Sequence, residues 1–237
     1  MPGLYISSPN APAALSALLH DFDLPVAACT REASAIPADL PLPAFLRAAS
    51  VAALLGQPIP AEALQTHLSG GSPLAANVLR RHLMLRRSLM PYLRPGRAVK
   101  ATDGGFCVGD ALLILPVSAD DTVDAPLPPG VWTELNGATH TGHLRSLRGY
   151  NETPLLVRQN ALLPVGMNGG SLAQTTPDDA DRLTLHWFQP GKASECILSD
   201  GTFYRTARNG SSLTVDTNAD KPFHLILHEN GTERLIR

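Results

Sequence analysis

The chain has 237 residues, of which 44% are apolar and 17% charged, and its formal net charge is −2. A chain of this length can bury about 70% of its unfolded surface, so it can fold without disulfides or a structural metal. The slightly negative charge argues against nucleic acid as a partner, because such binding normally requires a basic surface.

The sequence shows no clear pattern for a secretory signal, a membrane-spanning segment or a set of disulfides. Its apolar runs fall short of the roughly 20 residues that span a bilayer, so no membrane segment is predicted. The first residues lack the pattern of a secretory signal. Cys29, Cys107 and Cys196 are scattered and form no disulfide framework. We therefore expect a soluble, cytoplasmic protein without a cofactor.

The first part of the chain, to residue 97, has mainly helical spacing of its apolar residues. A short strand, a helix and a second strand predict a βαβ-like start, and three further helices follow. In chain order these elements are Leu4–Ile6, Ala13–His20, Pro25–Cys29, Phe45–Leu55, Ala61–Leu68 and Leu74–Leu93. Gly56 and Pro58 end the helix over Phe45–Leu55.

Beyond residue 98, short apolar runs alternate with Gly, Asn and Asp turns, a pattern typical of antiparallel β-sandwiches. Strands are predicted at Ala111–Val117, Val131–Leu135, Pro154–Val157 and Ala161–Val165, and alternating strands follow from Leu183. The fold class is therefore α+β: a helical region with a small α/β start, then sandwich units. We expect the domains to be 1–97, 98–167 and 168–237.

Two tryptophans are the candidates for carbohydrate binding, because indole faces stack on sugar rings. Trp132 and Trp187 both lie in predicted strands, where burial in the core is the default interpretation and sugar stacking is the alternative.

Paired histidines suggest metal binding less convincingly. His140 with His143, and His224 with His228, are pairs that no further Cys or His completes to a zinc site, so no metal site is predicted.

The helix over Leu74–Leu93 carries a basic cluster, Arg80-Arg81-His82 and Arg86-Arg87. These arginines could attract an anion. Because leucines interleave with them, the preferred interpretation is a packed helix with arginines at its edges, held by ion pairs.

Several stretches together resemble glycoside hydrolase family 31, the α-glucosidases and α-xylosidases. Asn77–Leu93 is similar to the family's helix ending in R-x-x-L-x-P-Y-L, and Phe106–Val117 to its Y-M-x-G-D-x-L-L-V-A-P-V segment. Leu127–Leu135 and Thr153–Gly166 resemble L-P-x-G-x-W and x-P-x-x-V-R-x-x-x-x-L-P-x-G. The resemblance covers residues 77–166, and Arg158-Gln-Asn160 is closest to the α-xylosidase branch.

The resemblance implies the end of a (β/α)8 barrel followed by a proximal and a distal β-sandwich. The family's catalytic aspartates lie in a D-M-N-E-like strand end and ahead of a D-I-G-G-F loop, and neither motif is present. Some ninety residues before the sandwich cannot close a barrel that typically needs about 250. No catalytic residue is therefore assigned.

Three functions follow as hypotheses. The first is a degenerate family 31-like protein that is non-catalytic alone and binds an oligosaccharide or a protein partner. The second is an accessory subunit or fragment of an active α-glycosidase, with a separate barrel subunit as its partner. The third is a structural interaction module.

Overall fold

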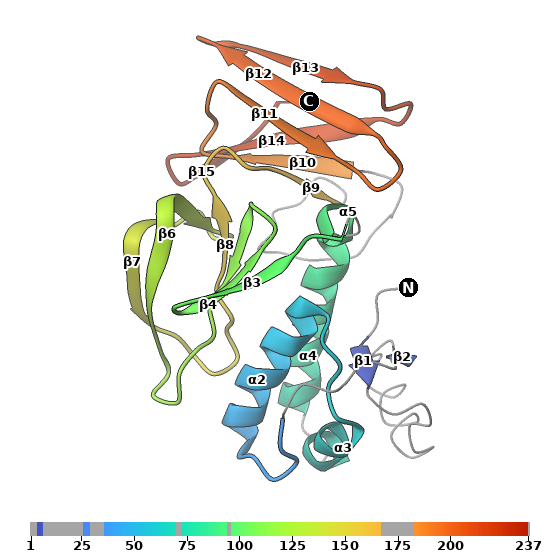
Figure 1. Cartoon of the computed structure of the whole chain (residues 1–237), viewed down its shortest axis with the longest axis vertical. Coiled ribbons are helices and arrows are strands. Elements are labelled where there is room, and N and C mark those ends of the chain that lie inside the picture. The colour runs from blue at the N-terminus through green and yellow to red at the C-terminus, as the bar shows by residue number, and fades with distance from the viewer. Residues whose placement is uncertain are drawn as a thin grey trace. The chain divides into compact units, whose positions relative to one another are not determined.

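The computed structural model describes residues 4–6, 26–28, 36–69, 73–93, 96–166 and 183–236 (Figure 1). The chain divides into two compact units. The first unit comprises Met1–Arg87, Pro116–Val123 and Ser146–Thr153, and the second comprises Ser88–Leu115, Asp124–Arg145 and Pro154–Arg237. The predicted α+β class is confirmed, whereas the division into three domains at residues 97 and 167 stays a prediction.

The first unit begins with two short parallel strands. β1 (Leu4–Ile6) pairs with β2 (Val26–Ala28), and Leu4 lies opposite Val26. Parallel neighbours require a crossover connection, as a βαβ unit provides. The helix predicted over residues 13–20 lies outside the described residues.

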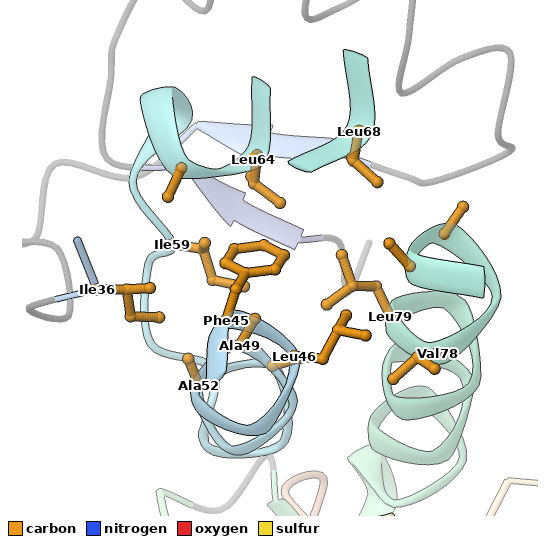
Figure 2. Close-up of a cluster of buried hydrophobic side chains, with 14 of the residues drawn as sticks. Ile36, Phe45, Leu46, Ala49, Ala52, Ile59, Leu64, Leu68, Val78 and Leu79 are labelled. Atoms are coloured by element: carbon orange, nitrogen blue, oxygen red, sulfur yellow. The ribbon is translucent and has the colours of Figure 1, made fainter. Parts of the chain in front are cut away.

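Three helices then build the core of the first unit: α2 (Leu42–Leu55), α3 (Ala61–Ser69) and α4 (Pro73–Ser88). Figure 2 shows Phe45 of α2 in the middle of this cluster, facing Leu64 of α3 and Leu79 of α4. All three side chains are fully buried. Burial of an apolar side chain of this size contributes about 2 kcal/mol.

Helix α2 agrees with its predicted end and starts earlier than predicted. Pro43 lies in the first turn, where its missing N–H costs no hydrogen bond. Gly56 follows the last residue with φ of 68°, and Gln57 N donates to Ala52 O at 2.9 Å. This hydrogen bond and the left-handed Gly56 form the glycine C-cap that the sequence indicates.

The single helix predicted over Leu74–Leu93 was wrong, because the structure divides it at Leu89. α4 ends at Ser88, and a separate short helix, α5 (Met90–Leu93), follows. Pro91 has no N–H to donate to the carbonyl four residues earlier, and its ring crowds that carbonyl. The helix therefore breaks just before the proline.

A six-stranded sheet with the order β3-β4-β5-β8-β6-β7 opens the second part of the chain. Its strands are β3 (Val99–Thr102), β4 (Gly105–Val108), β5 (Leu112–Ile114), β6 (Thr122–Glu134), β7 (Thr139–Leu147) and β8 (Leu155–Arg158). β6 is much longer than the predicted Val131–Leu135. Its prolines precede Trp132–Glu134, the segment that pairs with β8, so no ladder bond to β8 needs their nitrogen atoms.

Two further sheets form a sandwich within the second unit. One has the order β15-β14-β10-β9 and the other β11-β12-β13. The strands are β9 (Leu162–Val165), β10 (Leu183–Phe188), β11 (Ala193–Ile197), β12 (Phe203–Asn209), β13 (Ser212–Thr217), β14 (Phe223–Glu229) and β15 (Thr232–Leu235). Figure 1 shows β11, β12 and β13 stacked over β10 and β14.

The strands of this sandwich bury one face of each sheet against the other. Leu185 and Trp187 of β10 pack with Leu225 of β14 and Tyr204 of β12. The pairs are antiparallel as predicted, except that β10 and β14 run parallel. This exception arises because β11, β12 and β13 lie between them in the chain and belong to the other sheet.

Candidate functional site

Trp132 does not present its ring to solvent. It lies in β6, with 2% of its surface exposed, and its Nε1 donates a hydrogen bond to Pro128 O at 2.8 Å. A sugar ring can reach neither face of this indole as it stands in the structure.

Trp187 is buried still more completely. Its side chain has no exposed surface and belongs to the sandwich core between β10 and the sheet of β12. Its Nε1 donates to Asn160 Oδ1 at 3.0 Å. Both tryptophans are therefore buried in the core, as the default interpretation has it, and neither offers an open stacking surface.

Asn160 joins the turn between β8 and β9 to the turn between β10 and β11. Its backbone is left-handed, with φ of 60°. Its Oδ1 accepts from Trp187 Nε1 and from Gly191 N at 2.9 Å, and its Nδ2 donates to Ala193 O at 2.8 Å. Its carbonyl accepts from Ser194 Oγ at 2.7 Å. The side-chain amide thus makes one hydrogen bond to the indole of Trp187 in β10 and two to the segment that follows this strand.

The preceding Gln159 connects the same turn to β6. Its Oε1 accepts from Val131 N at 2.9 Å, and its own N–H donates to Val131 O at 2.7 Å. Arg158 completes the segment and lies opposite Trp132 in the sheet. The Arg158–Asn160 motif, which carries part of the family resemblance, is therefore a structural joint within the second unit.

A cavity of about 270 Å³ opens beside this joint. Its polar or ionisable lining side chains are Tyr92, Arg97, Asp110, Arg158, Gln159, Asn160, Ser194, Glu195 and Cys196. Arg97 lies over the Tyr92 ring with its guanidinium carbon 4.8 Å from the ring centre. The chemistry of this lining suits hydrogen bonding to a small polar molecule.

Cys196 does not supply a nucleophile to this cavity. Its side chain is buried, and burial raises the pKa of the thiol to about 12. Only the thiolate form reacts, and this form is rare at neutral pH. Covalent catalysis through Cys196 is therefore not a function that the cavity supports.

The carboxylates of the described residues serve mainly as partners of basic side chains. These contacts include the pairs Arg47–Asp121, His140–Glu134, His143–Asp124, Arg145–Asp124, Arg205–Glu195, Arg208–Glu229 and His228–Glu233. A glycosidase needs two carboxyl groups flanking the scissile bond, one with a raised pKa. Hydrogen bonds from Ser118 and Thr122 instead lower the pKa of Asp120, and bonds from Thr202 lower that of Asp200.

The histidines fall into positions that differ from a metal site. His140 and His143 each face a carboxylate on a neighbouring strand, and no group of three metal-ligating side chains is found among the described residues. His224 and His228 share one face of β14, as the extended spacing predicts. His186 contacts His228, and sequence reasoning missed this pair because β10 and β14 are far apart in the chain.

The arginines of α4 bind oxygen atoms of the first unit. Arg86 Nη1 donates to Leu54 O at 2.6 Å, Arg81 donates to Asn151 O, and Arg80 Nη1 donates to Asn77 Oδ1 at 2.8 Å. The packed helix is thus present, with these arginines bonded to backbone and amide oxygens, and the predicted ion pairs stay a prediction. The carboxylates Asp21 and Asp23, which in the sequence are most simply solvated loop charges, lie outside the described residues, as do the two glycines after Ser69, whose spacing fits no phosphate-binding loop.

Residues 83–163 match the family model described as the glycosyl hydrolase family 31 C-terminal domain. The resemblance read from the motifs is confirmed. No curated protein sequence matches the chain. Among the described helices, none is long and apolar enough to cross a membrane.

Solved family 31 structures share the fold. The cycloalternan-forming enzyme from Listeria monocytogenes has a TM-score of 0.65 and 17% identity, covering 92% of this chain and 25% of that one. The family 31 α-xylosidase from Xanthomonas citri has a TM-score of 0.61 and 15% identity, covering 83% and 28%. The family 31 dextranase from Flavobacterium johnsoniae has a TM-score of 0.60 and 17% identity, covering 79% and 30%.

The chain thus spans about a quarter to a third of the length of these enzymes. At this level of identity the likeness concerns the fold.

Proposed function

We propose that this chain is a non-catalytic supporting part of a family 31-type glycosidase, and that it joins a catalytic barrel formed by other residues. The observation that carries the proposal is the parallel pair β1–β2 in a chain whose later strands resemble the family's C-terminal domain. In a family 31 enzyme, the end of the parallel barrel precedes this domain.

The parallel pair supports a partner because two such strands make an incomplete sheet. In the described part of the chain, β1 and β2 form a sheet of two strands. All-parallel sheets are normally larger and covered by helices on both faces. Barrel strands from another segment or subunit would continue this sheet by backbone hydrogen bonds.

The polar and tryptophan side chains of the second unit also support a structural role for this part of the chain. The side-chain amides of Asn160 and Gln159 form hydrogen bonds with neighbouring backbone atoms, and Trp132 and Trp187 are buried. These contacts stabilise the β-domain, and none of them leaves a group free for glycosidic bond cleavage.

The proposal is tested by tagging the protein at its natural gene and purifying it under mild conditions. We expect a barrel with a D-M-N-E-like motif in the same polypeptide or in a tightly bound second chain, together with α-glycosidase activity of the purified assembly. A stable 25.2 kDa monomer without any barrel would contradict the proposal.

Direct oligosaccharide binding is a second candidate, favoured by the polar cavity beside Asn160. The relatives from Listeria and Flavobacterium are described with a pentasaccharide substrate and with glucose. Titration of the protein with glucose and isomaltotriose, followed by NMR shifts around Arg97 and Ser194, tests this candidate. Unchanged spectra at about 10 mM ligand would exclude useful binding there.

The structural interaction module and the cytoplasmic location both stay predictions from the sequence. The natural-gene purification addresses the first, since a non-glycosidase partner would favour it. Cell fractionation addresses the second.

A further inference from the structure

Two histidines are buried side by side on the face of the β15-β14-β10-β9 sheet that lies opposite the sandwich core. His186 is fully buried and His228 is 3% exposed. The distance between His186 Nδ1 and His228 Nε2 is 2.7 Å. Phe188 stacks on the His228 ring, with centres 4.1 Å apart and planes 4° from parallel. The two imidazoles are therefore held in fixed contact.

The position of the protons follows from Glu233. Its Oε1 lies 3.4 Å from His228 Nδ1, and a carboxylate favours a proton on that nitrogen. A neutral His228 then presents an unprotonated Nε2, which accepts the proton of His186 Nδ1. His186 Nε2 is left as a buried acceptor with no hydrogen-bond partner among the described residues.

Other ionisable groups around the pair come from three neighbouring strands. β14 supplies His224 on the same face and Glu229, which is bonded to Arg208 at 2.8 Å. β15 supplies Glu233, opposite His228, and Arg234, opposite Leu227. At the end of β6, Glu134 is bonded to His140.

The strands β9 and β10 carry no further ionisable side chain. Among the described residues, the carboxylate of Glu233 lies within ion-pair distance of the His228 ring.

Water has a route to this pair. His228, Glu229 and Glu233 line a cavity of about 310 Å³ together with Gln189 and the turn at Asn136. Protons from solvent can therefore reach the His228 side of the pair.

We propose that Glu233, His228 and His186 form an acid-sensitive latch, which holds β14 against β10 while the imidazoles share one proton and releases them when both become charged. With a proton on every nitrogen, two N–H groups would point at each other across 2.7 Å. Two positive charges would also be buried next to each other, and the carboxylate of Glu233 lies near His228 alone. The strands must separate to relieve this repulsion.

The direction of the pKa shifts agrees with this geometry. Burial, followed by the neighbouring His228, lowers the pKa of His186 to about 3, and burial lowers that of His228 to about 4. An unfolded or opened histidine takes up its proton near pH 6.5. The closed latch is therefore fully favoured above about pH 6.5 and loses stability as the pH falls toward 4.

Hydrogen exchange of the full-length protein tests the latch. Between pH 6 and pH 5, linkage permits an increase in the opening constant of up to about tenfold for each histidine. After correction for intrinsic exchange, we expect amides of β10 and β14 to open at least about tenfold more at pH 5. The variant His186→Leu should reduce this increase, while His143→Gln, at a half-exposed position, should leave it unchanged.

Direct titration protects the test against a variant that does not fold. In the wild-type protein, NMR of the imidazole nitrogens should show both His186 and His228 neutral at pH 6. A midpoint near 6.5 for both rings, or an equal pH effect in His186→Leu and wild type, would overturn the proposal.

Discussion

The indole nitrogen of Trp187 donates its hydrogen bond to the side-chain oxygen of Asn160, 27 residues earlier in the chain, at 3.0 Å. The same oxygen also accepts from Gly191 N, so one amide fixes both a core tryptophan and the loop that follows its strand. This relationship gives Asn160, the last residue of the Arg158–Asn160 segment in the family resemblance, a structural role within the second unit.

Removing this amide should destabilise the second unit. Asn160→Ala leaves Trp187 Nε1, Gly191 N and Ala193 O without their partner, and we expect a loss of about 3 kcal/mol in the free energy of unfolding. The matched control is Asn218→Ala, because Asn218 accepts one bond from Phe203 N at an exposed position. Urea unfolding measures both variants, and equal losses would contradict the role given to Asn160.

The C-cap of α2 provides a second test. A Cβ at Gly56 would lie 2.3 Å from Arg86 Nη2, so Gly56→Ala should displace the guanidinium that binds Leu54 O. We expect a loss of about 2–3 kcal/mol, against about 1 kcal/mol for Gly210→Ala. Gly210 has a similar φ of 60° and open space around it, so it isolates the backbone strain. Thermal unfolding that ranks the two variants equally would contradict this account.

The first unit should lose stability in acid through His82. Its ring is buried, its Nδ1 donates to Val78 O at 2.8 Å, and burial lowers its pKa to about 4. Because the unfolded histidine binds a proton near 6.5, stability is complete above that pH and falls by up to about 1.4 kcal/mol per pH unit below it.

Exchange of the α4 amides between pH 7 and pH 5 measures this loss. The variant His82→Leu should flatten the profile in α4 and leave β10 and β14 unaffected. A flat wild-type profile would show that His82 does not contribute.

The fluorescence of the two tryptophans should not respond to added sugar. Since Trp132 and Trp187 are buried, acrylamide should quench the folded protein several-fold less than the protein in guanidinium chloride. Adding isomaltotriose should change neither the emission maximum nor the quenching. A blue shift with saturable dependence on the sugar would place a ligand against one of the indoles.

The sequence predicted those helices and strands whose ends or spacing are set by nearby residues. Gly56 and Pro58 located the end of α2, and the alternation in Leu183–Phe188 located β10. Pro91 also carried the information that breaks the long helix, but the apolar spacing on both sides of it favoured continuity.

Long-range pairing was beyond this reasoning. Nothing local in Phe223–Glu229 indicates that β14 runs parallel to β10, and the contact between His186 and His228 depends on that register. The part of β6 that holds its prolines was not predicted as a strand, and it lies outside the Trp132–Glu134 segment that pairs with β8. The burial of both tryptophans, in contrast, follows the general tendency of aromatic residues in strands and was the default interpretation of their positions.

The most direct measurement of the central claim is glycoside hydrolysis by the purified 237-residue chain. Assayed with p-nitrophenyl α-D-xyloside and α-D-glucoside, it should release no p-nitrophenol above the buffer rate, because the catalytic carboxylates belong to a barrel that other residues form. Sustained release that co-elutes with the 25.2 kDa protein would contradict the account.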